Sequence, residues 1–137
     1  LLEAIRLLEQ AGCRRTDLLV ALGPAVSGAN YQVETVVAEQ VACSLPASAE
    51  GAVALEVALA ELESCGALHP DPQPGRHRLD IRAATRRQLE LAGITADRIA
   101  VCPLCTVAEP LLFHSWRRDQ VKAVQWSGIV SQQAGIS

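Results

Sequence analysis

The stretch from residue 101 to residue 130 restricts the possible folds most, because it holds three of the four aromatic side chains of the chain. Residues 112–118 and 121–130 are rich in Val, Ile, Phe and Trp, which strands favour. The polar pair Asp119 and Gln120 between them can turn the chain. The stretch therefore predicts an antiparallel hairpin at the C-terminal end of a sheet.

Two adjacent arginines, Arg117 and Arg118, end the first of these predicted strands. Because successive side chains of a strand point to opposite faces, one guanidinium is expected to point towards the core. A buried guanidinium requires a carboxylate, a phosphate or a group of carbonyls, since an unpaired buried charge costs too much free energy. Two interpretations remain open: an internal salt bridge, to Asp80 or Asp119, or an arginine that holds an anionic substrate.

A glycine-rich loop at residues 23–28 follows an aliphatic run at residues 18–22, which is typical of a strand buried on both faces. Gly23 permits a tight bend, and exposed backbone amides near Ser27 can hold an anion. The spacing matches neither a P-loop nor a dinucleotide-binding fingerprint. The loop is therefore either a simple turn or an anion-holding segment, with Gly23 and Ser27 as candidate substrate-binding residues.

Hydrophobic periodicity predicts helices at residues 1–11, 33–44, 50–65 and 80–92, the last capped by Asp80 and followed by Gly93. A second strand is predicted at residues 98–102, and the three prolines of residues 69–75 predict a loop. Strands that alternate with helices and end in a hairpin predict an α/β fold. Its mixed sheet would carry packed helices, as a layered sandwich with a C-terminal antiparallel hairpin.

Charge and hydropathy exclude two classes of partner. Residues 1–66 carry three basic and nine acidic side chains, whereas residues 67–137 carry nine basic and six acidic ones. The basic half does not interleave aromatic with basic residues, so we expect no nucleic-acid partner. No apolar run approaches the roughly 20 residues that a membrane span requires, so we expect no membrane partner either.

The chain contains five cysteines, an odd number, and no visible secretory signal. This predicts reduced thiols in a cytoplasmic protein. Cys102 and Cys105 form one CxxC motif, and no second such motif is present. Half of a zinc site, a redox dithiol and two ordinary half-buried cysteines all remain open for this pair.

Four segments resemble, in this order, the C-terminal half of the laccase-domain family: VALGPAVSGANYQV, LDIRAATRRQLELAGI, CPLCTVAEPLLFHSWRRD and VQWSGIV. Members of this family are also known as multicopper polyphenol oxidoreductases, purine nucleoside phosphorylases and peptidoglycan editing factors. The resemblance covers most of residues 1–131 and implies the same α/β sandwich. The chain departs from the family pattern at Val107, where the family has an aromatic residue, and at residues 114–118, where HSWRR replaces FSYRR.

The resemblance implies a zinc or copper ion, held by two histidines and one cysteine in an N-terminal half that this sequence does not contain. The chain opens on Leu1 and contains no Met, which also favours a portion of a longer protein. We therefore expect residues 1–137 to be the C-terminal portion of one laccase-type domain. Its missing N-terminal half would be its partner, and this portion would contribute no catalytic residue and no metal ligand.

The activity that the resemblance implies for the parent protein is metal-dependent phosphorolysis of adenosine and inosine. Deamination of adenosine and oxidation of polyphenols are implied as side activities. A purine nucleoside and phosphate are thus the implied ligands. This portion would supply the pocket wall and anion contacts, through Arg117 or Arg118 and the loop that contains Gly23 and Ser27. A non-catalytic binding or structural module is the alternative.

Overall fold

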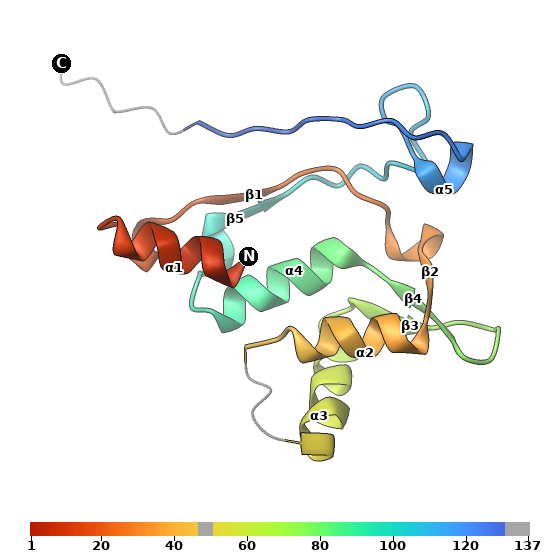
Figure 1. Ribbon diagram of the computed structural model, residues 1–137, viewed down its shortest axis with the longest axis horizontal. Helices are drawn as coiled ribbons and strands as arrows, with labels where there is room; N and C mark the ends of the chain where they lie inside the picture. The colour runs from red at the N-terminus through yellow and green to blue at the C-terminus, as the bar shows by residue number, and fades with distance from the viewer. Residues whose placement is uncertain (47–50, 131–137) are drawn as a thin grey trace.

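The computed structural model describes residues 1–46 and 51–130, and contains two small sheets with helices packed on them (Figure 1). A parallel pair joins β1 to β5, and an antiparallel sheet has the strand order β2, β4, β3. The helices and strands in chain order are α1 (Leu2–Gln10), β1 (Val20–Leu22), β2 (Gln32–Glu34), α2 (Thr35–Cys43), α3 (Gly51–Ser64), β3 (Leu68–Pro70), β4 (Arg76–Leu79), α4 (Ile81–Leu91), β5 (Ile99–Val101) and α5 (Trp116–Asp119). Short 3-10 turns are η1 (Arg15–Asp17), η2 (Gly28–Asn30) and η3 (Ala96–Arg98). The predicted mixed α/β class is confirmed.

Helix α4 connects the two parts of the core. In Figure 1 it lies below the β1–β5 pair and above α2 and α3. Ala84 of α4 packs in the larger cluster, whose fully buried leucines are Leu62 and Leu79. Leu89 packs one turn further on in a second cluster under the β1–β5 pair, with Ile5, Ile94 and Ile99. A single amphipathic helix therefore holds both sheets together. Within the described residues, no helix is both long and apolar enough to cross a membrane.

The helix predictions are confirmed because their local signals agree with the packing. The Asp80 carboxylate accepts hydrogen bonds from the backbone N–H groups of Arg82 and Ala83, at 2.9 and 3.1 Å, and so caps α4. Gly93 follows the helix with a φ of 89°, which glycine adopts without strain. The helices predicted at residues 1–11, 33–44 and 50–65 are α1, α2 and α3, except that residues 33 and 34, predicted to be helical, belong to strand β2. Residue 50 lies outside the described residues.

The strand predicted at residues 18–22 forms as β1, but the prediction that both of its faces are buried is wrong. Leu19 is 68% exposed, and Ala21 is exposed as well. Only one side of the strand packs against the second cluster, through Leu18, Val20 and Leu22. An aliphatic run reports a tendency to be buried, and it does not show that an element is present to cover each face.

The predicted loop at residues 69–75 is partly wrong, because residues 68–79 form the β3–β4 hairpin. Pro70 occupies β3, and β3 lies at the edge of its sheet. An edge strand tolerates proline, since one side of its backbone needs no ladder hydrogen bond. The prolines that suggested a loop are therefore compatible with this strand.

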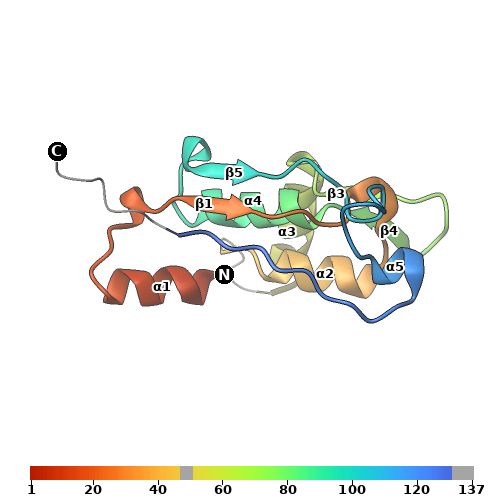
Figure 2. The same ribbon diagram turned by 90° about the horizontal axis from the view of Figure 1, so that it is seen from above.

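The C-terminal hairpin predicted at residues 112–130 is wrong for the described residues. Trp116–Asp119 forms the short helix α5, and residues 121–130 run extended without a strand partner (Figure 2). The backbone N–H of Asp119 donates to the carbonyl of Ser115 at 2.8 Å, so the chain turns helically where a strand was expected. Gln120 ends this turn in the left-handed conformation.

Gln120 offers a test of this turn, because its φ of 54° is unfavourable for a residue with a side chain. Replacing Gln120 with Gly is expected to raise the free energy of unfolding by about 1 kcal/mol, measured by urea denaturation. The matched change Lys122→Gly, in the extended segment, should leave stability unchanged or lower it slightly. Equal effects of the two changes would contradict the left-handed turn.

Candidate functional site

The carboxyl ends of β1 and β5 bring two loops together. Backbone pairing continues past both strands, since the Cys102 N–H donates to the Leu22 carbonyl at 2.9 Å and the Thr106 N–H donates to the Ala25 carbonyl at 3.1 Å. Ala25 and Cys105 also form a parallel bridge. In open α/β sheets, ligands bind beyond the carboxyl ends of parallel strands. This junction is therefore the candidate site.

The thiol of Cys105 lies at the centre of this junction, and the residue is only 8% exposed. The backbone N–H and the hydroxyl of Ser27 each donate to Cys105 Sγ at 3.3 Å. The side-chain amide of Asn30, in η2, donates to the same sulfur at 3.6 Å. The loop predicted to hold an anion thus directs its donors at a cysteine of the same chain.

These donors decide the ionisation of the thiol. Burial raises the pKa of Cys105, but hydrogen bonds from the Ser27 hydroxyl and from the backbone N–H groups of Ser27, Ala108 and Val107 outweigh it. The pKa consequently falls from 9.0 to about 7. Because donors that bond the charged form favour it, the junction stabilises a thiolate near neutral pH.

Sequence reasoning proposed Ser27 but missed Cys105 and Asn30 as its neighbours. The available signal was weak: a cysteine directly before Thr106, and two polar residues in a short glycine-rich segment. Gly23 lies at the other end of this segment, against the C-terminal stretch. A Cβ atom on Gly23 would stand 3.2 Å from Ser127 Oγ, so Gly23 permits a close approach of residues 121–130 rather than contacting Cys105.

The guanidinium of Arg118 bonds other groups of this chain. Its NH1 donates to the carbonyls of Thr106 and Val107 at 2.8 and 3.0 Å, and its NH2 donates to the carbonyl of Phe113 at 2.9 Å. Its Nε and NH2 also bond the Asp119 carboxylate, each at 2.7 Å. These contacts occupy all five N–H donors of a guanidinium. Carbonyls and a carboxylate were among the partners expected, and Asp119 rather than Asp80 supplies the charge.

Arg117 is exposed and has donors to spare. Its guanidinium carbon lies 4.6 Å from the centroid of the Tyr31 ring, and its NH1 donates to the Gln32 carbonyl at 3.0 Å. Among residues 1–46 and 51–130, these are its partners, so four of its five N–H donors are available. Tyr31 directly follows η2, whose Asn30 contacts Cys105. Of the two arginines, Arg117 is therefore the one with N–H donors left for another partner.

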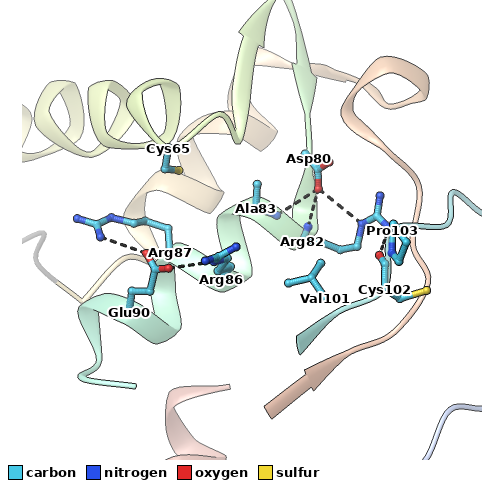
Figure 3. Close-up of a pocket in the computed structure, with 10 residues that line it drawn as sticks. All are labelled: Cys65, Asp80, Arg82, Ala83, Arg86, Arg87, Glu90, Val101, Cys102 and Pro103. Atoms are coloured by element: carbon cyan, nitrogen blue, oxygen red, sulfur yellow. Dashed lines mark hydrogen bonds and ion pairs between the residues drawn. The ribbon is translucent and has the colours of Figure 1, made fainter. Parts of the chain in front are cut away.

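A hollow of about 450 Å³ lies between α4 and the segment after β5 (Figure 3). Three arginines of α4 line it, but acidic partners offset their charges. Arg86 Nε lies 3.0 Å from Glu90, and Arg87 Nε lies 2.5 Å from Glu61. This hollow is consequently a poor candidate for a phosphate site, although its arginines make it conspicuous.

Arg82, the third arginine, anchors the loop that carries Cys105 (Figure 3). It is 8% exposed, and its NH1 donates to the carbonyls of Cys102 and Leu104, the latter at 2.8 Å. Its Nε lies 3.8 Å from the Asp80 carboxylate. Helix α4 therefore fixes the backbone immediately before Cys105 from one side, while Ser27 bonds the sulfur from the other.

The donor set at Cys105 does not fit the metal ion that the resemblance implies. Ser27 and Asn30 present N–H and O–H groups to the sulfur, whereas a zinc or copper site needs several lone-pair donors. In the part of the chain that the structure describes, no three His, Cys, Asp or Glu side chains gather closely enough to hold a metal ion. Cys102 and Cys105 are not joined in a disulfide, and both remain thiols.

Comparison with known proteins agrees with the resemblance in the sequence. A sequence model described as multi-copper polyphenol oxidoreductase laccase matches residues 1–132. The chain belongs to this laccase family. Among curated relatives, a purine nucleoside phosphorylase of Synechocystis sp. is 42% identical over 122 residues, which cover 88% of this chain and 46% of that protein. The purine nucleoside phosphorylase YlmD of Bacillus subtilis is 35% identical over 114 residues, covering 83% and 35%.

Solved structures of two other proteins share this fold. YlmD of Geobacillus stearothermophilus matches with a TM-score of 0.68 and 28% identity, over 86% of this chain and 38% of that one. A Bacillus licheniformis protein, YfiH, matches with a TM-score of 0.68 and 26% identity, over 86% and 39%. This chain therefore spans less than half the length of these relatives.

Proposed function

We propose that this chain is the C-terminal portion of a laccase-type domain that acts as a purine nucleoside phosphorylase in the cytoplasm. The observation that carries the proposal is the junction at the carboxyl ends of β1 and β5, where loop donors surround Cys105. It occurs in a chain whose curated relatives are named purine nucleoside phosphorylases. Adenosine and inosine are the proposed substrates.

Phosphorolysis moves the ribose carbon from a nitrogen of the base to an oxygen of phosphate, so the enzyme must hold phosphate beside the nucleoside. Arg117 is the proposed phosphate contact, because most of its N–H donors are available and it is exposed. Ser27 and Gly23 form part of the pocket wall in this proposal. Arg118 is assigned a positioning role, since it bonds the carbonyls of residues 106, 107 and 113.

The proposed zinc or copper ion, adenosine deamination and polyphenol oxidation belong to the parent protein. Such an ion would polarise a bound water or phosphate. Its ligands are proposed to lie in the portion of the relatives that has no counterpart here. The residues of this chain would then bind and orient the substrate.

Reconstitution tests the proposal. The complementary portion of the Synechocystis relative, which lies outside its match with this chain, would be mixed with this chain, inosine and phosphate. Hypoxanthine would be measured by chromatography. We expect product from the mixture and none from either part alone.

Arg117→Gln should raise the KM for phosphate by about tenfold, since a hydrogen bond to a charged group contributes about 1.5–3 kcal/mol. Arg86→Gln is the matched control, because Arg86 already pairs with Glu90 and should not affect the KM for phosphate.

A non-catalytic binding module is the second candidate, favoured by the exposed apolar side chains of the C-terminal stretch. If the two portions form a stable complex but no hypoxanthine, the binding module is supported and the proposed phosphorylase activity is contradicted. Turnover by this chain alone would contradict the division of roles between the two portions.

A further inference from the structure

Large apolar side chains are exposed along one segment of the molecule. In the extended segment 121–130, Trp126 is 92% exposed, Val130 85%, Val124 77% and Ile129 67%. Isolated exposed apolar residues are normal, but a continuous run of them marks an interaction surface. The backbone of this segment is equally unpaired: within the described residues, none of its groups bonds another backbone group.

The β1–β5 pair beside this segment is also incomplete. One of its faces packs on the cluster that contains Ile99, whereas Ala21 and Ala100, which are paired with each other and point to the other face, are exposed. Parallel sheets are normally covered on both faces, and two strands make a very small sheet. In the described part of the chain, each strand has one neighbour and one free edge. A free edge can accept an added strand.

The segment and the sheet border a common groove. Figures 1 and 2 show residues 121–130 running past β1. The groove, of about 460 Å³, is lined on one side by residues 21–23 and 100–102 and on the other by residues 127–129. Ser127 approaches Gly23 across this groove. Outside the groove, the Gln125 side chain in the middle of the segment accepts a hydrogen bond from the His114 N–H at 3.0 Å.

We propose that this surface, formed by the exposed side of β1–β5 and residues 121–130, docks the complementary portion of the domain that the longer relatives possess. That portion would add at least one strand to the free edge of β1 or β5 and cover the apolar side chains. The relatives provide such an occupant, since 54% of the Synechocystis protein and 62% of the Geobacillus chain lie outside the match (100 minus 46, and 100 minus 38).

The charge of the surface favours a protein over a lipid occupant. Residues 121–130 contain one charged side chain, Lys122, whereas anionic membranes attract segments with several basic residues. The unpaired backbone groups also need hydrogen-bond partners, which another polypeptide supplies and a lipid acyl chain does not. The inference depends on the proposed function only for the choice of partner, and it requires no catalysis.

The test measures binding without nucleoside or phosphate. The probe is the complementary portion of the Synechocystis relative, titrated into the Trp116→Phe form of this chain, in which Trp126 is the one remaining tryptophan. The emission of the probe alone is subtracted at each point of the titration. We expect saturable binding with a blue shift of the Trp126 emission. Val124→Lys, in the extended segment, should weaken binding by at least about tenfold, because it places a charge where an apolar side chain is buried. Val57→Lys on α3, where Val57 is 63% exposed, is the matched control and should leave binding unchanged.

Three results would overturn the inference. Binding that is insensitive to Val124→Lys, or equally sensitive to Val57→Lys, would place the interface elsewhere. Dimers of this chain in sedimentation, without binding to the probe, would assign the surface to a second copy. A blue shift with anionic phospholipid vesicles but not with the probe would assign it to a membrane. If binding responds to the variants as expected but the mixture forms no hypoxanthine, the docking surface is supported. Only the proposed phosphorylase activity is then contradicted.

Discussion

Replacing Arg82 with Met is expected to lower the free energy of unfolding by about 3–5 kcal/mol, the usual cost of removing one partner from a buried charged network. Arg82 is 8% exposed and donates to the carbonyls of Cys102 and Leu104. Methionine occupies much of the same volume but leaves both carbonyls and the Asp80 carboxylate without this donor. Urea denaturation followed by circular dichroism would measure the change.

Arg86→Met is the matched control, since Arg86 lies on the same helix and also pairs with a carboxylate. Its side chain is 46% exposed, and its partner Glu90 lies one turn further along α4. Such an exposed pair contributes about 0.3–0.5 kcal/mol, so stability should change little. Equal losses in the two variants would show that Arg82 does not anchor the loop. A large loss in Arg82→Met alone would confirm the anchor.

The helices were predictable because their signals are local. The period of apolar residues, the Asp80 cap and the glycine after α4 all act within one element, and the structure contains each of them. The C-terminal hairpin was not predictable in this way. Residues 121–130 have the composition of a strand, but a strand also needs a partner, and composition does not report whether one is present. The same limit explains the exposed face of β1.

The predicted bonding partners of a side chain can be correct where its predicted secondary structure is wrong. Arg117 and Arg118 were predicted on a strand, with carbonyls or a carboxylate as partners for the one that points inwards. Both lie on a helix, and Arg118 is the one that bonds carbonyls and a carboxylate. The donors around Cys105 could not be predicted from the motif. Ser27 is 78 residues away in the sequence, and the directions of backbone N–H groups at residues 107 and 108 depend on the folded loop.

Cys105 should make the stability of this chain depend on pH between about 6 and 9. The pKa of the thiol is about 7 in the folded chain, below its ordinary value of 9.0, so the folded state binds fewer protons in this range. The free energy of unfolding should therefore rise with pH. The gain from Cys105 would be complete above pH 9 and lost as the pH falls through 7, and two pKa units correspond to roughly 2–3 kcal/mol. Urea denaturation at several pH values measures this rise.

Cys105→Ser is the control that isolates the thiol, because a serine hydroxyl does not titrate in this range and its curve should lose this rise. The difference in ultraviolet thiolate absorbance between the two proteins should show a midpoint near pH 7. Ser27→Ala removes one of the two Ser27 donors, and should move that midpoint upward by about one unit, since a hydrogen bond to a charged group contributes about 1.5–3 kcal/mol. A midpoint close to 9 in the unchanged chain would refute the thiolate. A midpoint of 7 that Ser27→Ala leaves in place would mean that the charge is stabilised without the Ser27 hydroxyl, by the backbone N–H groups and the Asn30 amide.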